Sequence, residues 1–278
     1  ANSVHLLIKA ANVLGMTDDA ASYTQLLGLI KDAFMKEYVT PNGRLVSGTQ
    51  TAYVLALNFD MLPAELREQA ASRLAANVKS YGHLTTGFLG TPYLCHVLSR
   101  FGYTDLAYDL LLRKKYPSWL YPVTMGATTI WERWDGQKPD GSFQTPGMNS
   151  FNHYAYGAIG DWMYRVMAGL DTREEAPGYK NSVIKPHIGG GFTYVSASLE
   201  TYYGLLACSW KVNGKNLAME VVIPVNTTAT VHIPANDPGE ILEGGLPLTQ
   251  VKEIQVNGAE DGFVVVKLGS GRYRFERK

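Results

Sequence analysis

An excess of charge of either sign is absent from this 278-residue chain, in which 25 Lys and Arg residues balance 25 Asp and Glu residues. Nucleic acid and anionic lipid are held by a basic field, so the balance argues against both as partners. Charged residues are 18% of the chain and aromatic residues 11%, unlike the composition of a disordered scaffold. The longest apolar stretches fall far short of the roughly 20 residues that span a bilayer. We therefore expect no nucleic-acid and no membrane partner.

Cysteine is also scarce, with only Cys95 and Cys208. A disulfide framework needs more cysteines, and a metal site needs them closer together, so we expect both to be small buried apolar side chains. The sequence has no HExxH or paired-histidine spacing, no GxSxG elbow and no Walker A loop. No metal site is therefore predicted. A chain of this length can still bury a large core in one or two domains.

Helical periodicity dominates residues 1 to about 170, with apolar side chains recurring every three to four positions. The expected helices cover residues 1–15, 18–39, 49–59, 63–82, 92–101, 104–112 and 150–168. Several are apolar over a wide arc, which is typical of helices packed between two neighbours, as in a ring of helical hairpins. The chain starts inside a helix and without an initiator Met, so we expect a fragment of something longer.

Strand patterns replace the helical ones from about Gly178. Segments such as 192–199 alternate large apolar and small polar residues, and Asn213-Gly214 is a strong hairpin signal between two apolar runs. About seven short strands with turns every 8 to 12 residues predict an antiparallel β-sandwich. The sequence thus predicts an all-α domain of helical hairpins over residues 1–175 and a small all-β domain over residues 176–278.

Glu132 is the candidate with the most chemical content. It stands between Trp131 and Trp134 in a long segment rich in Pro, Gly and aromatic residues, and long loops in compact domains are often functional. An apolar setting suits a carboxyl group to acid–base catalysis, and indole faces suit sugar rings. The alternative is that both tryptophans are core residues and that Glu132 pairs with Arg133 or another base.

Two further segments carry polar groups at expected helix starts. His153 lies near the beginning of the expected helix 150–168, where Ser150 is a possible N-cap, and it is either a site residue or a core histidine. Thr86 lies in a turn with Gly87 and Gly90, which is either functional or an ordinary helix-capping connector. What remains is carboxylate chemistry on an aromatic-lined helical scaffold, as glycoside hydrolysis requires.

Three strings together resemble the bacterial α-L-rhamnosidases of glycoside hydrolase family 78: TTGFLGTP (85–92), GATTIWERWDG (126–136) and SFNHYAYGAIGDWMY (150–164). The order of helical hairpins, WERW segment and C-terminal sandwich is similar as well. The resemblance implies an (α/α)6-barrel domain, cleavage of terminal α-L-rhamnose with inversion, and no metal or organic cofactor. It implies Glu132 as the general base, His153 as a sugar-binding residue, and Trp134 and Thr86 near the sugar pocket.

One feature departs from this family. Nothing upstream of Thr85 matches the acidic, arginine-containing motif of the family's general acid, and seven helices are fewer than the twelve of such a barrel. We therefore expect the C-terminal part of a rhamnosidase, whose partners are a rhamnose-containing glycoside or polysaccharide and the remaining N-terminal part. Exposed helix faces would otherwise favour a homodimer. The rival interpretations are a hydrolase or lyase for another sugar, a non-catalytic carbohydrate-binding fragment, and a structural partner of a missing subunit.

Overall fold

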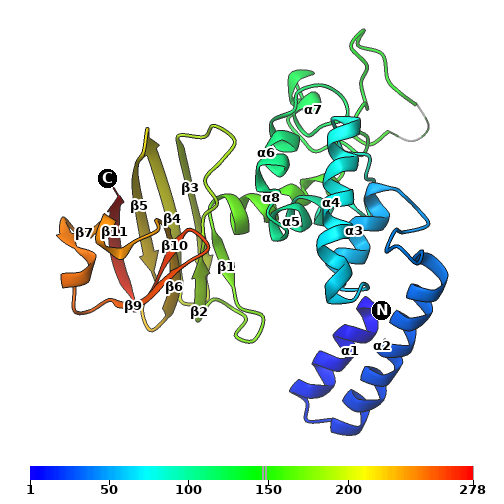
Figure 1. Ribbon diagram of the computed structural model, residues 1–278. Coiled ribbons are helices and arrows are strands. Elements are labelled where there is room, and N and C mark those ends of the chain that lie inside the picture. Colours follow the sequence, from blue (N-terminus) through cyan, green and yellow to red (C-terminus); the bar gives the residue numbers. More distant parts are fainter. Residues whose placement is uncertain (146, 148, 278) are drawn as a thin grey trace. The chain divides into compact units, whose positions relative to one another are not determined.

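The computed structural model describes residues 1–145, 147 and 149–277 and divides the chain into two compact units, Ala1–Ala158 and Ile159–Lys278. The first unit is helical and the second is largely β-structure (Figure 1). We refer to them as the helical unit and the β unit. Among the described residues, no helix is both long and apolar enough to cross a membrane.

The helical unit follows the predicted helices closely along most of its length. Its α-helices are α1 Asn2–Val13, α2 Thr17–Tyr38, α3 Gln50–Asn58, α4 Ala64–Tyr81, α5 Thr91–Arg100, α6 Thr104–Leu112 and the short α7 Leu120–Thr124. The Thr49 side chain caps α3 by accepting a hydrogen bond from Ala52 N. Gly82, with φ of 68°, ends α4 in the left-handed conformation, as expected of a C-terminal glycine. Helix α6 begins at Thr104 and has no side-chain cap.

Helices α1 and α2 form a hairpin (Figure 1). Most of its apolar side chains are exposed or half-buried. Each helix buries a single residue, Ala11 in α1 and Ala20 in α2. Leu7 and Leu26, which the periodicity placed on core-facing stripes, are 46% and 42% exposed. The sequence pattern of these helices is therefore that of buried elements, while the chain itself does not cover them.

The helix predicted over residues 150–168 is wrong in its first part. Residues 150–154 are irregular, and the helical segment is composed of a 3-10 helix η1 Ala155–Ala158, one α-turn α8 Ile159–Trp162 and a π-helix η2 Met163–Met167. The main chain of residues 150 and 153 pairs with another segment instead, as described below. Gly157 and Gly160 also weaken α-helical propensity.

The β unit contains two sheets, with strand orders β1-β2-β6-β10-β9 and β3-β4-β5-β11-β7-β8. The strands are β1 Leu170–Thr172, β2 Asn181–Ile184, β3 Tyr194–Thr201, β4 Gly204–Asn213, β5 Asn216–Ile223, β6 Thr228–Pro234, β7 Ile241–Glu243, β8 Leu246–Pro247, β9 Gln255–Glu260, β10 Phe263–Leu268 and β11 Gly271–Arg277. Strand β1 lies inside the range that we predicted to be helical, and the boundary at 175 stays a prediction.

Most neighbouring strands are antiparallel, but β2 and β6 run parallel, with Asn181 beside Thr228 and Ile184 beside Val231. The expectation of a purely antiparallel sandwich is therefore corrected at this pair. Both sheets contribute buried apolar side chains to one core cluster, including Val231 and Val264 from the five-stranded sheet and Trp210 and Phe275 from the six-stranded sheet. Cys95 and Cys208 are free and buried, as predicted.

Candidate functional site

Glu132 and His153 lie on two segments that run antiparallel within the helical unit. Glu132 N donates to Ser150 O over 2.8 Å, and His153 N donates to Ile130 O over 2.8 Å. We call residues 129–132 and 150–153 the paired segments. Because these bonds join main-chain atoms, the pairing fixes the backbones of Glu132 and His153 relative to each other.

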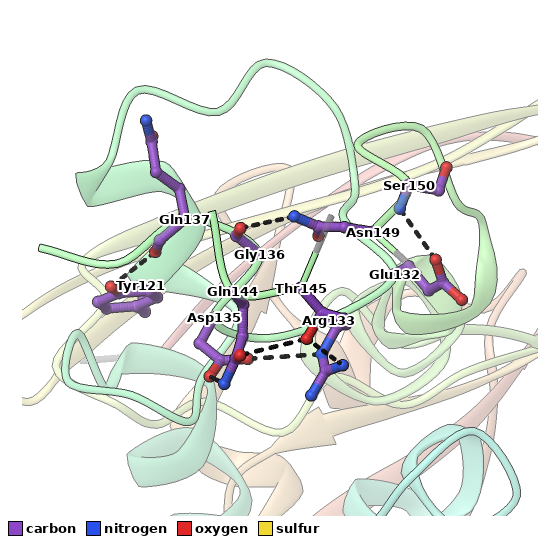
Figure 2. Close-up of polar contacts among 10 residues, drawn as sticks. All are labelled: Tyr121, Glu132, Arg133, Asp135, Gly136, Gln137, Gln144, Thr145, Asn149 and Ser150. Carbon is purple, nitrogen blue, oxygen red and sulfur yellow. Dashed lines mark hydrogen bonds and ion pairs between the residues drawn. The ribbon is translucent and has the colours of Figure 1, made fainter. Parts of the chain in front are cut away.

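The Glu132 carboxylate is half-buried and held in one orientation. Ser150 N donates to Glu132 Oε2 over 2.9 Å, a charge-assisted hydrogen bond when the carboxylate is ionised. Oε1 makes no hydrogen bond to any residue within 1–145, 147 and 149–277. Figure 2 shows this second oxygen turned away from Ser150. One carboxylate oxygen is therefore oriented by the protein and the other is available to a ligand.

The alternative interpretation paired Glu132 with Arg133, but Arg133 contacts other residues in the structure. Its Nε atom lies 3.8 Å from Asp135 Oδ1, and its Nη1 donates to Thr145 Oγ1 over 3.4 Å. Gln144 Nε2 donates to Asp135 Oδ2 over 2.9 Å, so Arg133, Asp135, Gln144 and Thr145 form one polar network (Figure 2). The guanidinium charge is thus directed to Asp135, and no residue that the structure describes forms an ion pair with the Glu132 carboxylate.

Residues 133–149 form an excursion between the paired segments. Asn149 Nδ2 donates to Gly136 O over 2.8 Å at the base of the excursion. Lys138 N donates to Ser142 O over 2.8 Å near a tight turn, where Gly141 has φ of 84°. Hydrogen bonds within the excursion and across its base therefore support the described part of this long loop.

The His153 imidazole stacks on an aromatic ring of another motif. The Phe88 ring lies 4.9 Å from it, centroid to centroid, with 15° between the planes. Phe88 also contacts Tyr156, with centroids 5.1 Å apart. The TTGF loop and the segment around His153, which are far apart in sequence, are therefore joined by three rings.

The buried side-chain amide of Gln50 holds the loop that contains the sequence TTGF (residues 85–88). The Gln50 side chain at the start of α3 donates to His83 O over 3.1 Å and accepts from Thr85 N over 2.8 Å. The Thr86 hydroxyl is buried and shares a 2.8 Å hydrogen bond with the Thr91 hydroxyl. Thr86 thus links the connector to the first residue of α5 without capping the helix, which has no side-chain cap, and its contact with a sugar stays a prediction.

Trp134 belongs to the same aromatic cluster. It stacks on Tyr156 with centroids 3.7 Å apart and 15° between planes, and it meets Trp119 edge-on at 5.5 Å. Trp119 Nε1 donates to Tyr156 O over 2.9 Å. Trp131 is buried and packs edge-on against Phe151, so this indole is a core residue as the alternative interpretation has it. Trp134 is half-buried.

The hollow beside this cluster is small. It measures about 40 Å³ and lies among Trp119, Trp131, Trp134 and Tyr156, which is room for a few water molecules rather than a sugar ring. Burial raises the pKa of the Tyr156 hydroxyl, and nearby Tyr116 raises it further. No cluster of three or more His, Cys, Asp or Glu side chains suited to a metal is found in the described part of the chain.

The structure thus joins Glu132 and His153 through the paired segments, and His153 to Trp134 through Phe88 and Tyr156. Sequence reasoning did not single out Phe88, Tyr156 or Trp119. Phe88 and Tyr156 lie inside the strings that carry the family resemblance, and their position there was the available signal. Trp119 gave no signal besides its residue type.

Two family models match the chain. The model of the bacterial alpha-L-rhamnosidase 6 hairpin glycosidase domain matches residues 1–167, and that of the bacterial alpha-L-rhamnosidase C-terminal domain matches residues 169–245. An α-L-rhamnosidase of Streptomyces avermitilis is 43% identical over 276 residues, which cover 99% of this chain and 26% of the relative. An α-L-rhamnosidase of Formosa agariphila is 40% identical, with coverage of 100% and 30%.

Solved structures give the same result. The crystal structure of the Streptomyces avermitilis α-L-rhamnosidase complexed with L-rhamnose has a TM-score of 0.91 and 44% identity, and the match covers 99% of this chain and 26% of that one. The native α-L-rhamnosidase of Aspergillus terreus has a TM-score of 0.88 and 33% identity, with coverage of 100% and 29%. The chain therefore spans between a quarter and a third of these relatives.

Proposed function

Because the chain belongs to the bacterial α-L-rhamnosidase family, we propose that it is the C-terminal part of a glycoside hydrolase that removes terminal α-L-rhamnose from glycosides or polysaccharides. The observation that carries the proposal is the Glu132 carboxylate, which the Ser150 amide orients and whose other oxygen bonds to none of the described residues. The related Streptomyces avermitilis enzyme was crystallised with L-rhamnose, which supports this sugar over the rival ones.

Glu132 acts as the general base in the proposed reaction. Its Oε1 accepts a proton from a water molecule, whose oxygen attacks the anomeric carbon as the bond to the leaving oxygen breaks. The leaving oxygen takes a proton from a separate general acid. Because the water attacks from the face opposite the leaving group, the released sugar has inverted configuration.

The general acid belongs to the rest of the enzyme in this proposal. An inverting pair of carboxyl groups lies about 6.5–9.5 Å apart, with the sugar and a water between them. None of the acids upstream of Thr85 has the sequence context of the family's acid, and the 40 Å³ hollow is too small for the sugar. The upstream part would supply both the acid and the missing walls of the pocket.

The proposed position of that upstream part is the exposed apolar surface of the α1–α2 hairpin. Leu7 and Leu26 lie on this surface, and closing an (α/α)6 barrel over them would bury them. A second copy of the chain is the alternative cover. Sedimentation of the isolated chain, with and without the upstream part, distinguishes a homodimer from a complex with that part.

His153 and Trp134 contact the sugar in this proposal. The His153 imidazole, held by Phe88, would hydrogen-bond sugar hydroxyls, while Trp134, held by Tyr156, would pack on the apolar side of the ring. Thr86 would lie at the pocket through the TTGF loop that carries Phe88. None of these steps uses a metal or an organic cofactor.

Turnover of p-nitrophenyl α-L-rhamnoside tests the proposal. The chain is assayed alone and together with the upstream part of the Streptomyces avermitilis relative, with Glu132→Gln and the exposed Glu68→Gln as matched variants. We expect little activity from the chain alone and activity from the mixture. Glu132→Gln should lower kcat about 10²–10⁴-fold, as loss of a general base does, and Glu68→Gln should leave it unchanged. Proton NMR should show the β-anomer of rhamnose first.

Other outcomes would contradict specific parts of the proposal. Full activity of Glu132→Gln in the mixture would remove Glu132 from the base role. First release of the α-anomer would contradict inversion. Activity of the chain alone that is lost in Glu132→Gln would place the general acid within these 278 residues.

A further inference from the structure

The five-stranded sheet of the β unit carries a hollow of about 690 Å³ on its outer face. Along β6, Thr228, Thr230 and His232 line the hollow, while the residues between them belong to the sandwich core. Alternate residues of a strand point to opposite faces, so the hollow is on the side away from the core. Its volume is in the range of roughly 300–1,000 Å³ that is usual for small-molecule sites.

The neighbouring strand β10 completes the floor of this sheet hollow. Val265 pairs with His232, and Lys267 pairs with Thr230, so their side chains share one face. Other polar residues line the hollow from β2, from β9 and from the turn after β1, namely Asn181, Ser182, Gln255, Asn257, Arg173 and Glu175.

A bulge brings Asn257 into the lining. Val265 of β10 pairs with Gly258, whereas the adjacent Val266 pairs with Val256, so Asn257 is the extra residue of β9. Gly258 has φ of 113°, a conformation that side-chain-bearing residues rarely adopt. Bulges bend a strand and redirect its side chains, and they recur beside functional sites.

The polar walls of the sheet hollow are held by hydrogen bonds. Arg173 Nη2 donates to Thr230 Oγ1 over 2.8 Å, and Arg173 Nη1 lies 3.8 Å from Glu175 Oε1. Thr228 Oγ1 donates to Asn181 Oδ1 over 2.7 Å. Groups fixed in advance lose little freedom when a ligand binds, which favours a site over an incidental depression.

The charges of the lining balance. Among the lining residues, Arg173 and Lys267 are matched by Glu175 and Glu260, so the lining itself carries no net charge to attract a phosphate or a polyanion. Its apolar lining is confined to small or isolated side chains, Ala176, Ala259 and Val265 among them, which offers no anchor pocket for an apolar peptide side chain. Apart from His232 and Gly258, the rest of the lining consists of amide and hydroxyl side chains, which both donate and accept.

His232 is a further polar group of the lining. Its Nδ1 is buried, and the Ile184 main chain is a hydrogen-bond partner of the imidazole. Burial, followed by the charges of Lys185 and Arg173, lowers the pKa of His232 to about 4. At neutral pH the ring is therefore uncharged, with one nitrogen donating and the other accepting, which matches a sugar hydroxyl.

We propose that the sheet hollow is a binding site for a neutral saccharide, distinct from the Glu132 site and independent of the proposed hydrolysis. The lining presents neutral amide and hydroxyl groups that donate and accept, the polar imidazole of His232, and charged residues whose charges balance. A saccharide offers the matching set of hydroxyl groups without net charge.

Binding measurements on the 278-residue chain test this proposal. The chain is screened against immobilised neutral and sulfated oligosaccharides of two to four residues, and the strongest neutral binder is titrated by calorimetry. Thr230→Val and His232→Leu each remove a polar group of the hollow with little change in volume. We expect each to weaken binding about 5- to 10-fold, the loss usual for one hydrogen bond between uncharged groups.

Matched variants complete the experiment. Lys267→Ala, inside the hollow, should weaken binding, while Lys211→Ala, an exposed lysine on β4 of the other sheet, should not. His153→Ala in the helical unit should leave this binding unchanged. If His232→Leu fails to fold, as its near-ultraviolet circular dichroism will report, the near-isosteric Thr230→Val carries the test.

Three results would overturn the inference. One is that no neutral saccharide binds. Another is binding that survives Thr230→Val and is lost in His153→Ala, which would place the sugar in the helical unit. The third is preferential binding of sulfated members, which would contradict a neutral ligand.

Discussion

The ring of Phe88 stacks on the imidazole of His153, 4.9 Å away and 15° from parallel. Phe88 belongs to a loop that Gln50 anchors to α3, whereas His153 belongs to the paired segments beside Glu132. A flat ring against a histidine restricts the imidazole to one plane, and Ala155 N donates to His153 Nδ1 over 3.4 Å. Phe88 is therefore a positioning residue for His153 in the proposed site.

Replacing Phe88 by Leu should release the imidazole while keeping most of the packing volume. The carbon-bound protons of His153 lie in the ring current of Phe88, so we expect their NMR resonances to move downfield in Phe88→Leu. Phe143→Leu is the matched control, because Phe143 packs on Phe151 and not on His153. Unchanged His153 resonances in Phe88→Leu would show that the stacking does not fix the imidazole in solution.

His153→Ala should act on substrate binding more than on chemistry. In the mixture with the upstream part, we expect KM for p-nitrophenyl α-L-rhamnoside to rise about 10-fold while kcat changes little. The reason is that a hydrogen bond to sugar hydroxyls stabilises the bound substrate and the transition state equally. A fall in kcat as large as that of Glu132→Gln would instead give His153 a part in proton transfer.

Gly169, which precedes β1, should be the least replaceable glycine of the β unit. It has φ of 83°, and a Cβ atom there would lie 2.3 Å from Pro186 N. Gly178 has a similar φ of 88° and open space around it. Gly178→Ala should lower the free energy of unfolding by about 1–2 kcal/mol through backbone strain, and Gly169→Ala by a further 1–3 kcal/mol or so through the clash. Urea unfolding of the two variants measures the difference, and equal losses would contradict the close approach to Pro186.

Acid should destabilise the β unit through His232. Burial lowers the pKa of this residue to about 4 in the folded chain, against 6.5 in the unfolded chain. Between these values the unfolded state binds more protons, so stability falls as the pH drops from about 6.5 to 4. After allowance for solvent screening of a half-buried ring, the loss is about 1–2 kcal/mol.

Calorimetric melting of His232→Leu between pH 4 and 7 checks this slope. The variant should lose most of the pH dependence, and His187, whose pKa burial also lowers, accounts for a remainder. Replacing the exposed His5 by Gln provides the control and should preserve the slope. A wild-type slope in His232→Leu would assign the effect to other groups.

Local patterns were enough to predict most of the helical unit. Periodicity and end signals located α2 within a residue of each end, and Gly82 ended α4 as its backbone freedom predicts. The same reasoning failed at residues 150–154, because their main-chain groups bond to residues 130 and 132 rather than within a helix. A pattern of side chains does not report a competing partner that is distant in sequence.

The sequence was enough to name residues of the candidate site but not to predict the contacts between them. Glu132 and His153 could be named from their motifs, whereas the Ser150 amide on the carboxylate and the Phe88 ring on the imidazole depend on tertiary contacts. The parallel pairing of β2 with β6 was missed for the same reason, because β2 is only four residues long and its partner lies more than 40 residues downstream.

Because the paired segments are joined at the base of the loop, the length of the loop between them can vary without changing that base. Their joining bonds use main-chain atoms, which every residue but proline can supply, and the excursion 133–149 turns back near Gly141. Residues inserted at that tip lengthen the loop at a small entropic cost and leave the base unchanged. The loop between the paired segments can therefore change in length by insertion or deletion, while the main-chain bonds that hold the backbones of Glu132 and His153 stay the same.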